Sequence, residues 1–193
     1  MTMPAFDTLA EPAAVETVVV TRQPIMDATN RLIGYDLLVH GAEWGDENAD
    51  PAARRDSVQR TLMHVFVDLG IERLVGTADA FMSLPRAALA VASSLPITGS
   101  RAVIGVDLRT PLDLETVNHI GTLRRKGFRI ALEHAAAGAQ GPQMQRALEN
   151  AQFAKYAIGD KPDPAALKWM RSYGLRALVT GIDDRELLQA ATA

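Results

Sequence analysis

The stretch that decides the fold runs from residue 103 to residue 132, VIGVDLRTPLDLETVNHIGTLRRKGFRIAL, and contains two apolar runs separated by an amphipathic segment. Val103 to Val106 is short and apolar, as expected for a strand buried on both faces. Thr110-Pro111 then opens a helix with apolar residues at helical spacing, namely Leu114, Val117, Ile120 and Leu123. The second run begins at Phe128. This stretch predicts two parallel strands joined by a helix.

The same unit recurs on both sides of this stretch. Short apolar runs begin near Asp79, Val103, Phe128, Phe153 and Arg176, at intervals of 23 to 25 residues. So regular a period predicts a repeated strand–helix unit and a parallel sheet covered by helices. An open doubly wound nucleotide-binding sheet has a glycine-rich turn after its first strand, and the sequence contains neither GxGxxG nor GxxxxGK(S/T). The pattern therefore favours a (β/α) barrel.

The segments before these repeats predict a β-hairpin and a long helix. Two extended runs, Thr17 to Val20 and Leu32 to Val39, flank the turn-rich cluster Asp27 to Asn30. After an acidic loop, Asp50-Pro51 starts a helix, with Asp as N-cap and Pro at the first helical position. This helix is expected to end at Gly70.

Six barrel-type strands can be counted, the second hairpin strand and the five periodic runs, whereas a closed TIM barrel has eight. We therefore predict an α/β fold: an incomplete TIM-type (β/α) barrel with an N-terminal β-hairpin. Residues 1–15 are expected to form a flexible tail. Residues 16–193 are expected to form one barrel domain that lacks the last two barrel strands.

The composition narrows the class of protein. The chain has 193 residues, of which 48% are hydrophobic and 22% charged, and this balance is typical of a soluble globular protein. Its net charge of −3 argues against nucleic-acid polymers and anionic membranes as partners. The absence of cysteine excludes disulfides, thiolate zinc sites and a cysteine nucleophile. With no signal-peptide pattern and no apolar run of membrane-spanning length, a cytoplasmic location is expected.

Two segments near the start of the chain carry a resemblance to a known family: residues 20–27, VTRQPIMD, and residues 34–40, GYDLLVH. They resemble the start of an EAL domain, the cyclic-di-GMP phosphodiesterase module, in which QPI-x-D is followed by GYE-L-L-x-R. In particular they resemble the branch found N-terminal to HDOD domains. Later segments continue the resemblance in the family's order, at 81–84 (FMSL), 103–106 (VIGV), 127–134 (GFRIALEH), 154–157 (AKYA) and 179–183 (VTGID).

Members of this family hold two Mg²⁺ or Mn²⁺ ions at the mouth of the barrel and cleave a phosphodiester with a metal-activated water. Such ions prefer carboxylate oxygens in near-octahedral geometry. The resemblance implies that several ligands are altered here. Asp36 stands at the Glu of the first motif and Ser83 at an Asn, whereas Gly105 and Thr180 stand at Glu positions and Ala157 at an Asp.

The remaining family positions are partly kept. Glu133 and His134 stand for an Asp-Asp pair, Lys155 keeps the family's Lys, and Asp183 matches a final Glu. His40 replaces the Arg that closes the first motif, so a phosphate-binding guanidinium is lost. We therefore interpret these ten positions as a vestigial site, with no catalytic residue and no metal. His40, Glu133 and His134 could also form a set for Zn²⁺ or Fe²⁺, although solvated remnants of a decayed site are the favoured interpretation.

Two functions from different classes follow. The favoured hypothesis is a catalytically inactive EAL-like module that acts as a regulatory or protein-interaction platform in bacterial signalling; it needs no cofactor and is not an enzyme, with residual activity left open. The alternative is a divergent metal-dependent cyclic-di-GMP phosphodiesterase of weak activity, which needs Mg²⁺ or Mn²⁺. Cyclic-di-GMP binding is expected to be weak or absent, because only Gln23, Leu38 and Lys155 keep nucleotide-contact positions. The open barrel predicts a protein partner, such as an HDOD domain, or self-association.

Overall fold

The computed structural model describes residues 18–27, 29–40, 50–99, 101–134, 141–157 and 164–180, together with 182, 186 and 189. Its strands are β1 (Val19–Met26), β2 (Leu32–His40), β3 (Asp79–Leu84), β4 (Ala102–Asp107), β5 (Arg129–Glu133), β6 (Phe153–Ala157) and β7 (Arg176–Thr180). They form one sheet in the order of the sequence, from β1 to β7. The strands from β2 to β7 pair in parallel, and β1 joins the edge as the antiparallel partner of β2.

The hairpin is closed by a turn that Asp27 holds. The Asp27 side chain accepts hydrogen bonds from the backbone N–H groups of Thr29 and Arg31 and from the Thr29 hydroxyl, at 2.7 to 3.0 Å. Asn30 adopts φ 59°, a left-handed conformation that Asn tolerates better than most residues. Strand β1 extends beyond the β-branched run at its start and includes Pro24. Proline is compatible with this strand because an edge strand tolerates the missing N–H.

The helices are α1 (Pro51–Met63), the π-helix η1 (His64–Gly70), α2 (Ile71–Val75), α3 (Arg86–Ser94), α4 (Leu114–Arg125), α5 (Pro142–Asn150) and α6 (Pro164–Ser172). Asp50 caps α1 as predicted, and its side chain accepts from the N–H groups of Ala52 and Ala53. The helix expected to reach Gly70 instead changes from α to π geometry at His64. The next predicted helix begins at Leu114 and not at Thr110-Pro111, because the Asp113 side chain accepts from the Thr116 N–H and fixes the first turn there.

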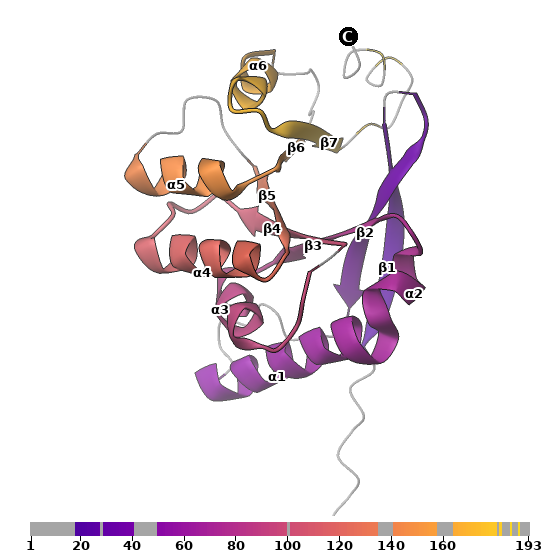
Figure 1. The fold of residues 1–193 in the computed structure, drawn as a ribbon, viewed down its shortest axis with the longest axis vertical. Helices are drawn as coiled ribbons and strands as arrows, with labels where there is room; N and C mark the ends of the chain where they lie inside the picture. Colours follow the sequence, from indigo (N-terminus) through magenta and orange to yellow (C-terminus); the bar gives the residue numbers. More distant parts are fainter. Residues whose placement is uncertain are drawn as a thin grey trace, which may run out of the picture.

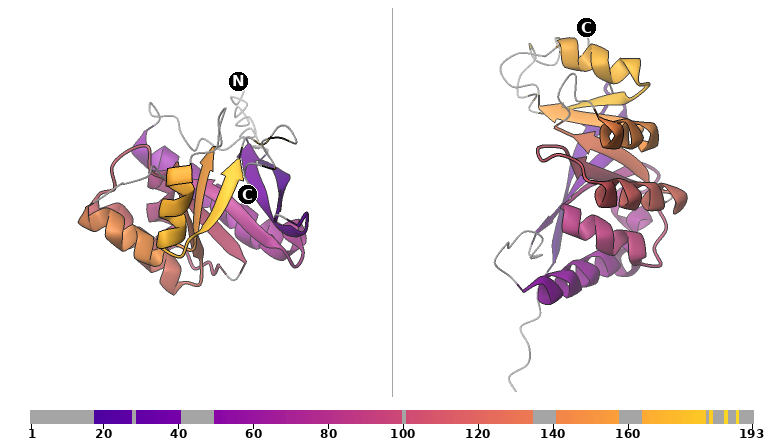
Figure 2. Two further views of the ribbon diagram at one scale, coloured as in Figure 1. Left: turned by 90° about the horizontal axis from the view of Figure 1, so that it is seen from above. Right: turned by 90° about the vertical axis from the view of Figure 1, so that its left-hand side faces the viewer.

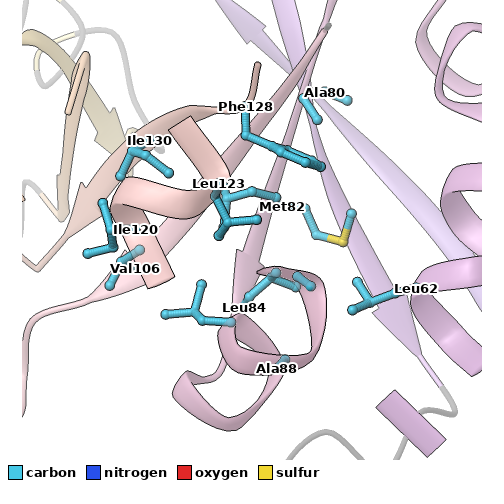
Figure 3. Close-up of a cluster of buried hydrophobic side chains, with 14 of the residues drawn as sticks. Leu62, Ala80, Met82, Leu84, Ala88, Val106, Ile120, Leu123, Phe128 and Ile130 are labelled. Carbon is cyan, nitrogen blue, oxygen red and sulfur yellow. The ribbon is translucent and has the colours of Figure 1, made fainter. Parts of the chain in front are cut away.

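The sheet curls, and the helices cover its outer, convex side (Figures 1 and 2). The main core lies between this side and the helices. Figure 3 shows Met82 and Leu84 of β3 among Leu62, Ala88, Leu123 and Phe128, which come from α1, α3, α4 and the residue before β5. These side chains are all nearly inaccessible to water. Burial of apolar area on this scale is the main force that holds the helices on the sheet.

A second, smaller apolar cluster lies on the inner, concave side of the sheet. It consists of one residue from each of five consecutive strands: Phe81, Val103, Ala131, Phe153 and Leu178. Ile25 and Ile33 of the hairpin pack against it, so the hairpin contacts the same interior as β7. The Phe153 ring is edge-on to Phe81, at 5.1 Å between centroids. This cluster fills the interior of the half-barrel below the ends of the strands.

The predicted fold class is confirmed: the chain forms an incomplete TIM-type barrel with an N-terminal hairpin. The six barrel-type strands counted from the sequence are the six parallel strands, and β1 adds a seventh to the same sheet. The predicted tail and the predicted domain limits stay predictions, because residues 1–17 lie outside the described residues. Among the described residues, no helix has the length and apolar composition that crossing a bilayer requires.

Candidate functional site

The candidate site is the inner face of the sheet at the carboxyl ends of the parallel strands, which we call the mouth. Side chains alternate between the two faces of a strand, and register partners in a parallel ladder share a face. The register pairs Ser83 with Gly105 and Glu133 with Lys155. Extended to the other strands, it places Asp36, Ser83, Gly105, Glu133, Lys155 and Thr180 on the inner face, among other predicted site positions.

Lys155 lies at the centre of the mouth and contacts two carboxylates. Its Nζ donates to Asp36 Oδ2 at 2.6 Å and lies 3.5 Å from Glu133 Oε1. Asp36 is on β2 and Lys155 on β6, so the ion pair crosses the interior of the half-barrel, with three strands between the two in the sheet order. The three side chains are largely buried, with exposed fractions of 16% for Asp36, 21% for Lys155 and 12% for Glu133. The pair therefore ties together two distant parts of the sheet.

The environment of Lys155 keeps its ammonium charged. Burial by itself lowers the pKa of Lys155, since a charged group loses hydration there. The hydrogen bond to Asp36 and the charges of Glu133 and Asp36 act in the other direction. Their combined effect is larger, so the pKa of Lys155 lies above its usual value of 10.5. Lys155 is consequently a permanent cation at neutral pH.

Glu133 reaches across β4 because residue 105 is glycine. Its Oε1 accepts a hydrogen bond of 2.6 Å from the hydroxyl of Ser83, which is on β3, whereas Glu133 is on β5. A Cβ atom at Gly105 would lie only 2.3 Å from that oxygen. The Glu133 carboxylate thus occupies the space that a side chain at residue 105 would take. The mouth thus has a carboxylate beside residue 105, although that residue itself supplies none.

The rim of the mouth carries further charged groups. Arg109 Nε donates to Asp107 Oδ2 at 2.8 Å, and this hydrogen bond holds the pKa of Asp107 below its usual value of 3.8, although burial acts to raise it. His134 directly follows Glu133 but is exposed, and it adopts φ 55°, a strained conformation for a residue other than glycine. Its backbone N–H donates to the Lys155 carbonyl at 2.9 Å. Glu133 is thus buried in the mouth, whereas His134 is exposed at its rim.

The remaining predicted residues are more dispersed. His40 Nε2 lies 3.0 Å from the Thr21 hydroxyl, on the exposed hairpin. Gln23 and Leu38 are on the inner face of the hairpin and are also exposed. Ala157 is the register partner of Thr180 at the ends of β6 and β7. Asp183 lies outside the described residues.

The donor set of the mouth does not fit a divalent metal ion. No three acidic or histidine side chains of the described ranges lie close enough together to hold one, and this includes His40, Glu133 and His134. Mg²⁺ requires near-octahedral coordination at 2.0–2.1 Å, mostly by oxygen. Here Asp36 Oδ2 accepts from Lys155, while Glu133 Oε1 faces both Lys155 and Ser83. The oxygens that point into the mouth are thus satisfied by donors of the chain itself.

One polar contact outside the mouth has no counterpart in the sequence analysis. Ser93 Oγ on α3 lies 2.9 Å from His119 Nδ1 on α4, and His119 Nε2 lies 3.5 Å from Glu115 Oε1. This resembles a serine–histidine–carboxylate array. However, the Ser93 hydroxyl donates to the Ala90 carbonyl within its own helix, at 2.8 Å. The proton that a nucleophilic serine gives to histidine is thus already engaged, so we interpret the contact as one that packs α3 against α4.

Fold and site together define a class: an incomplete TIM-type barrel with a charged mouth at the carboxyl ends of its parallel strands, where barrel enzymes place their active sites. Solved structures that are similar to the chain in fold include EAL domains. The PaMucR phosphodiesterase in complex with c-di-GMP shares 12% identity at a TM-score of 0.64, over 91% of this chain and 89% of that one. An EAL domain protein from Listeria monocytogenes EGD-e shares 15% identity at a TM-score of 0.61, over 95% and 88%.

A third structure, the Bacillus subtilis YkuI protein with an EAL domain, in complex with its substrate c-di-GMP and calcium, shares 15% identity at a TM-score of 0.68. There the match covers 92% of this chain but 51% of the other. No protein-family model and no curated protein matches the sequence. At such low identities the likeness is one of fold, and at that level it confirms the resemblance to EAL domains drawn from the motifs.

The prediction that the chain is not an enzyme is wrong. It was drawn from the altered residues at the family's site positions. The solved structures that share its fold include a phosphodiesterase in complex with c-di-GMP. The physical reason lies at β4. Counting ligands position by position treats Gly105 as the loss of a carboxylate, yet the Glu133 side chain brings a carboxylate next to residue 105. Altered residue identities at the mouth therefore do not demonstrate an inactive site.

Proposed function

We propose that this chain is an EAL-type module of bacterial cyclic-di-GMP signalling that acts as a regulatory or protein-interaction platform. The fold likeness to EAL domains and the QPI-x-D segment at residues 23–27 support the signalling family. The observation that carries the platform role is the pairing of Lys155 with Asp36 and Glu133. Charges at the mouth are satisfied by one another.

This pairing makes the mouth a poor site for a phosphodiester anion. Phosphate oxygens are bound by cationic side chains or N–H groups that have free donors. Two carboxylates and one ammonium give the central cluster a net charge of −1. At the rim, Arg109 is held by Asp107. A nucleotide would have to break these pairs before it gained its own, so we expect weak or absent binding of cyclic-di-GMP.

The surfaces that remain suited to a partner lie on the hairpin and the sheet edges. Val19 and Leu38 are 48% and 46% exposed on the inner face of the hairpin, and Met26 and Leu32 are exposed next to its turn. Strands β1 and β7 are the two ends of the strand order over the described residues. Exposed apolar side chains beside a strand edge favour association with another chain. A second copy of the chain and an HDOD domain are the partners we propose.

A divergent cyclic-di-GMP phosphodiesterase is the second candidate, and one observation favours it. Asp36, Glu133 and Lys155 come from three strands and converge at the mouth, where they could position a phosphodiester and exchange protons with it. All three residues lie on the inner face of the sheet. Convergence of this kind is typical of catalytic sites as well as of structural ion-pair networks.

Light scattering and a hydrolysis assay on the same preparation separate the two candidates. The platform proposal expects an average mass above 20.8 kDa at micromolar concentration and a return toward 20.8 kDa for Leu38→Glu. Leu114→Glu, an equally exposed leucine on α4, serves as the matched control and should leave the mass unchanged. A monodisperse 20.8 kDa protein would contradict self-association of the platform. If that protein also converts cyclic-di-GMP to a linear dinucleotide and loses this activity on Lys155→Met, the phosphodiesterase is the correct function.

A further inference from the structure

We propose that Lys155 is a built-in cation of the mouth: its ammonium takes the place between Asp36 and Glu133 that a divalent ion would need, so that the mouth excludes Mg²⁺ and Mn²⁺ as long as Lys155 is present. The inference concerns the site used in the proposed function and rests on its geometry. Its test measures metal binding, so it can fail while the platform role stands.

The position of the ammonium is the first argument. Lys155 Nζ is 2.6 Å from Asp36 Oδ2 and 3.5 Å from Glu133 Oε1, and thus lies between oxygens of two different strands. A divalent ion bound to the same two oxygens would have to lie about 2 Å from each. That ion and the ammonium would then compete for the same space. They also carry like charges in a largely buried setting, where repulsion is poorly screened.

The fixed orientation of Glu133 is the second argument. Its Oε1 accepts from the Ser83 hydroxyl at 2.6 Å and also faces Lys155. Of the two lone pairs of this oxygen, the Ser83 hydroxyl engages one, and the Lys155 ammonium faces the oxygen as an ion-pair partner at 3.5 Å. The carboxylate fits there because residue 105 is glycine: a Cβ atom at that residue would lie only 2.3 Å from Glu133 Oε1. Glu133 therefore offers its oxygen to the chain's own donors and not to an ion.

Removal of the ammonium reverses this situation. Lys155→Met has a side chain of similar length without charge, so Asp36 and Glu133 are left as two uncompensated carboxylates in a largely buried site. Together with the Ser83 hydroxyl they present three oxygen donors on one face of the sheet. Oxygen donors with two negative charges suit Mn²⁺ and Mg²⁺. Loss of the lysine should thus create a cation site that the native chain lacks.

Calorimetric titration of the full chain with MnCl₂ tests this, together with the loss of the free Mn²⁺ signal in electron paramagnetic resonance. We expect Lys155→Met to bind one Mn²⁺ at least about tenfold more tightly than the native chain. Lys126→Met is the matched control, since Lys126 donates to the Leu95 carbonyl and has no partner at the mouth among the described residues. It should bind Mn²⁺ no better than the native chain. Adding Asp36→Asn to Lys155→Met should remove the gained site.

Two results would overturn the inference. The first is saturable Mn²⁺ binding by the native chain as tight as that by Lys155→Met. The second is a folded Lys155→Met that gains no Mn²⁺ affinity. Circular dichroism and thermal melting check folding, and Lys155→Gln, which keeps a donor toward Asp36 but no charge, replaces Lys155→Met if the latter does not fold. Light scattering on each variant keeps self-association apart from the metal result.

Discussion

Substitution of Gly105 by alanine should destabilise the protein, although alanine is the smallest possible addition and suits a strand. The new Cβ would lie 2.3 Å from Glu133 Oε1 and 2.7 Å from Glu133 Cδ, distances that no two such atoms maintain. The Ser83 Cα, at 3.2 Å, limits relief on the other side. Because Glu133 is the flexible partner, its carboxylate has to leave the space beside residue 105 and lose the hydrogen bond from Ser83.

Two opposing effects determine the size of this change. A hydrogen bond to a charged group stabilises a folded protein by about 1.5–3 kcal/mol. Replacement of glycine by alanine restricts the unfolded chain and returns about 0.4–1 kcal/mol where the backbone conformation suits alanine. The net expectation is a loss of about 1–2 kcal/mol in the free energy of unfolding. For a chain of this size that corresponds to a fall of about 2–8 °C in Tm.

Differential scanning calorimetry measures this change against a matched control. Gly121 lies on α4, and a Cβ there meets nothing closer than Arg125 Nη1 at 3.6 Å. Gly121→Ala should therefore raise stability by about 0.5–1 kcal/mol, as expected inside a helix. In a Ser83→Ala background the cost of Gly105→Ala should shrink by about 1 kcal/mol, because the hydrogen bond is already absent. A Gly105→Ala protein with an unchanged or higher Tm would refute the assignment of the space beside residue 105 to Glu133.

Two further predictions concern the inner apolar cluster and the dependence of Tm on acid pH. Leu178→Asp places a charge in the inner apolar cluster and should lower the free energy of unfolding in urea by about 3 kcal/mol. Leu114→Asp, at an exposed position, should change the free energy of unfolding by less than about 0.5 kcal/mol. Equal effects of the two substitutions would contradict the inner cluster. Hydrogen bonds from Thr116 lower the pKa of Asp113 below 3.8, so the stabilisation is complete above pH 3.8 and is lost as the pH falls through the lowered pKa. Asp113→Asn should flatten the fall in Tm below pH 3.8. If Tm fell with pH in the same way in the variant and the native chain, the result would argue against Asp113 as the N-cap of α4.

The strands could be predicted because their apolar runs are short and bounded. β3, β6 and β7 begin at the predicted residues Asp79, Phe153 and Arg176. The helix α3 escaped prediction since half of its buried residues are alanine, and Pro85 at its N-cap makes no side-chain hydrogen bond. The change to π geometry at His64 has no signature in the sequence, as the apolar spacing through Val65 and Leu69 fits either helix.

The site was predictable in position but not in its contacts. The resemblance assigned Asp36, Glu133 and Lys155 to the site of the family, and the register brings them to one face. Whether a carboxylate lies beside residue 105 depends on the reach of the Glu133 side chain and on the space left by Gly105. These two residues are 28 positions apart in the sequence and lie on neighbouring strands. A position-by-position comparison treats each residue as independent, and such a compensation lies outside its scope.

The ion pair between Asp36 and Lys155 joins residues 119 positions apart, and this distance along the chain has a consequence for folding. The hairpin that carries Asp36 makes local antiparallel contacts, which form within microseconds. Its register with β3 spans only Gly34 to Asp36, so it is weakly held on that side. The hairpin can therefore pair before Lys155 has been synthesised, whereas the ion pair that connects it to β6 can form only afterwards.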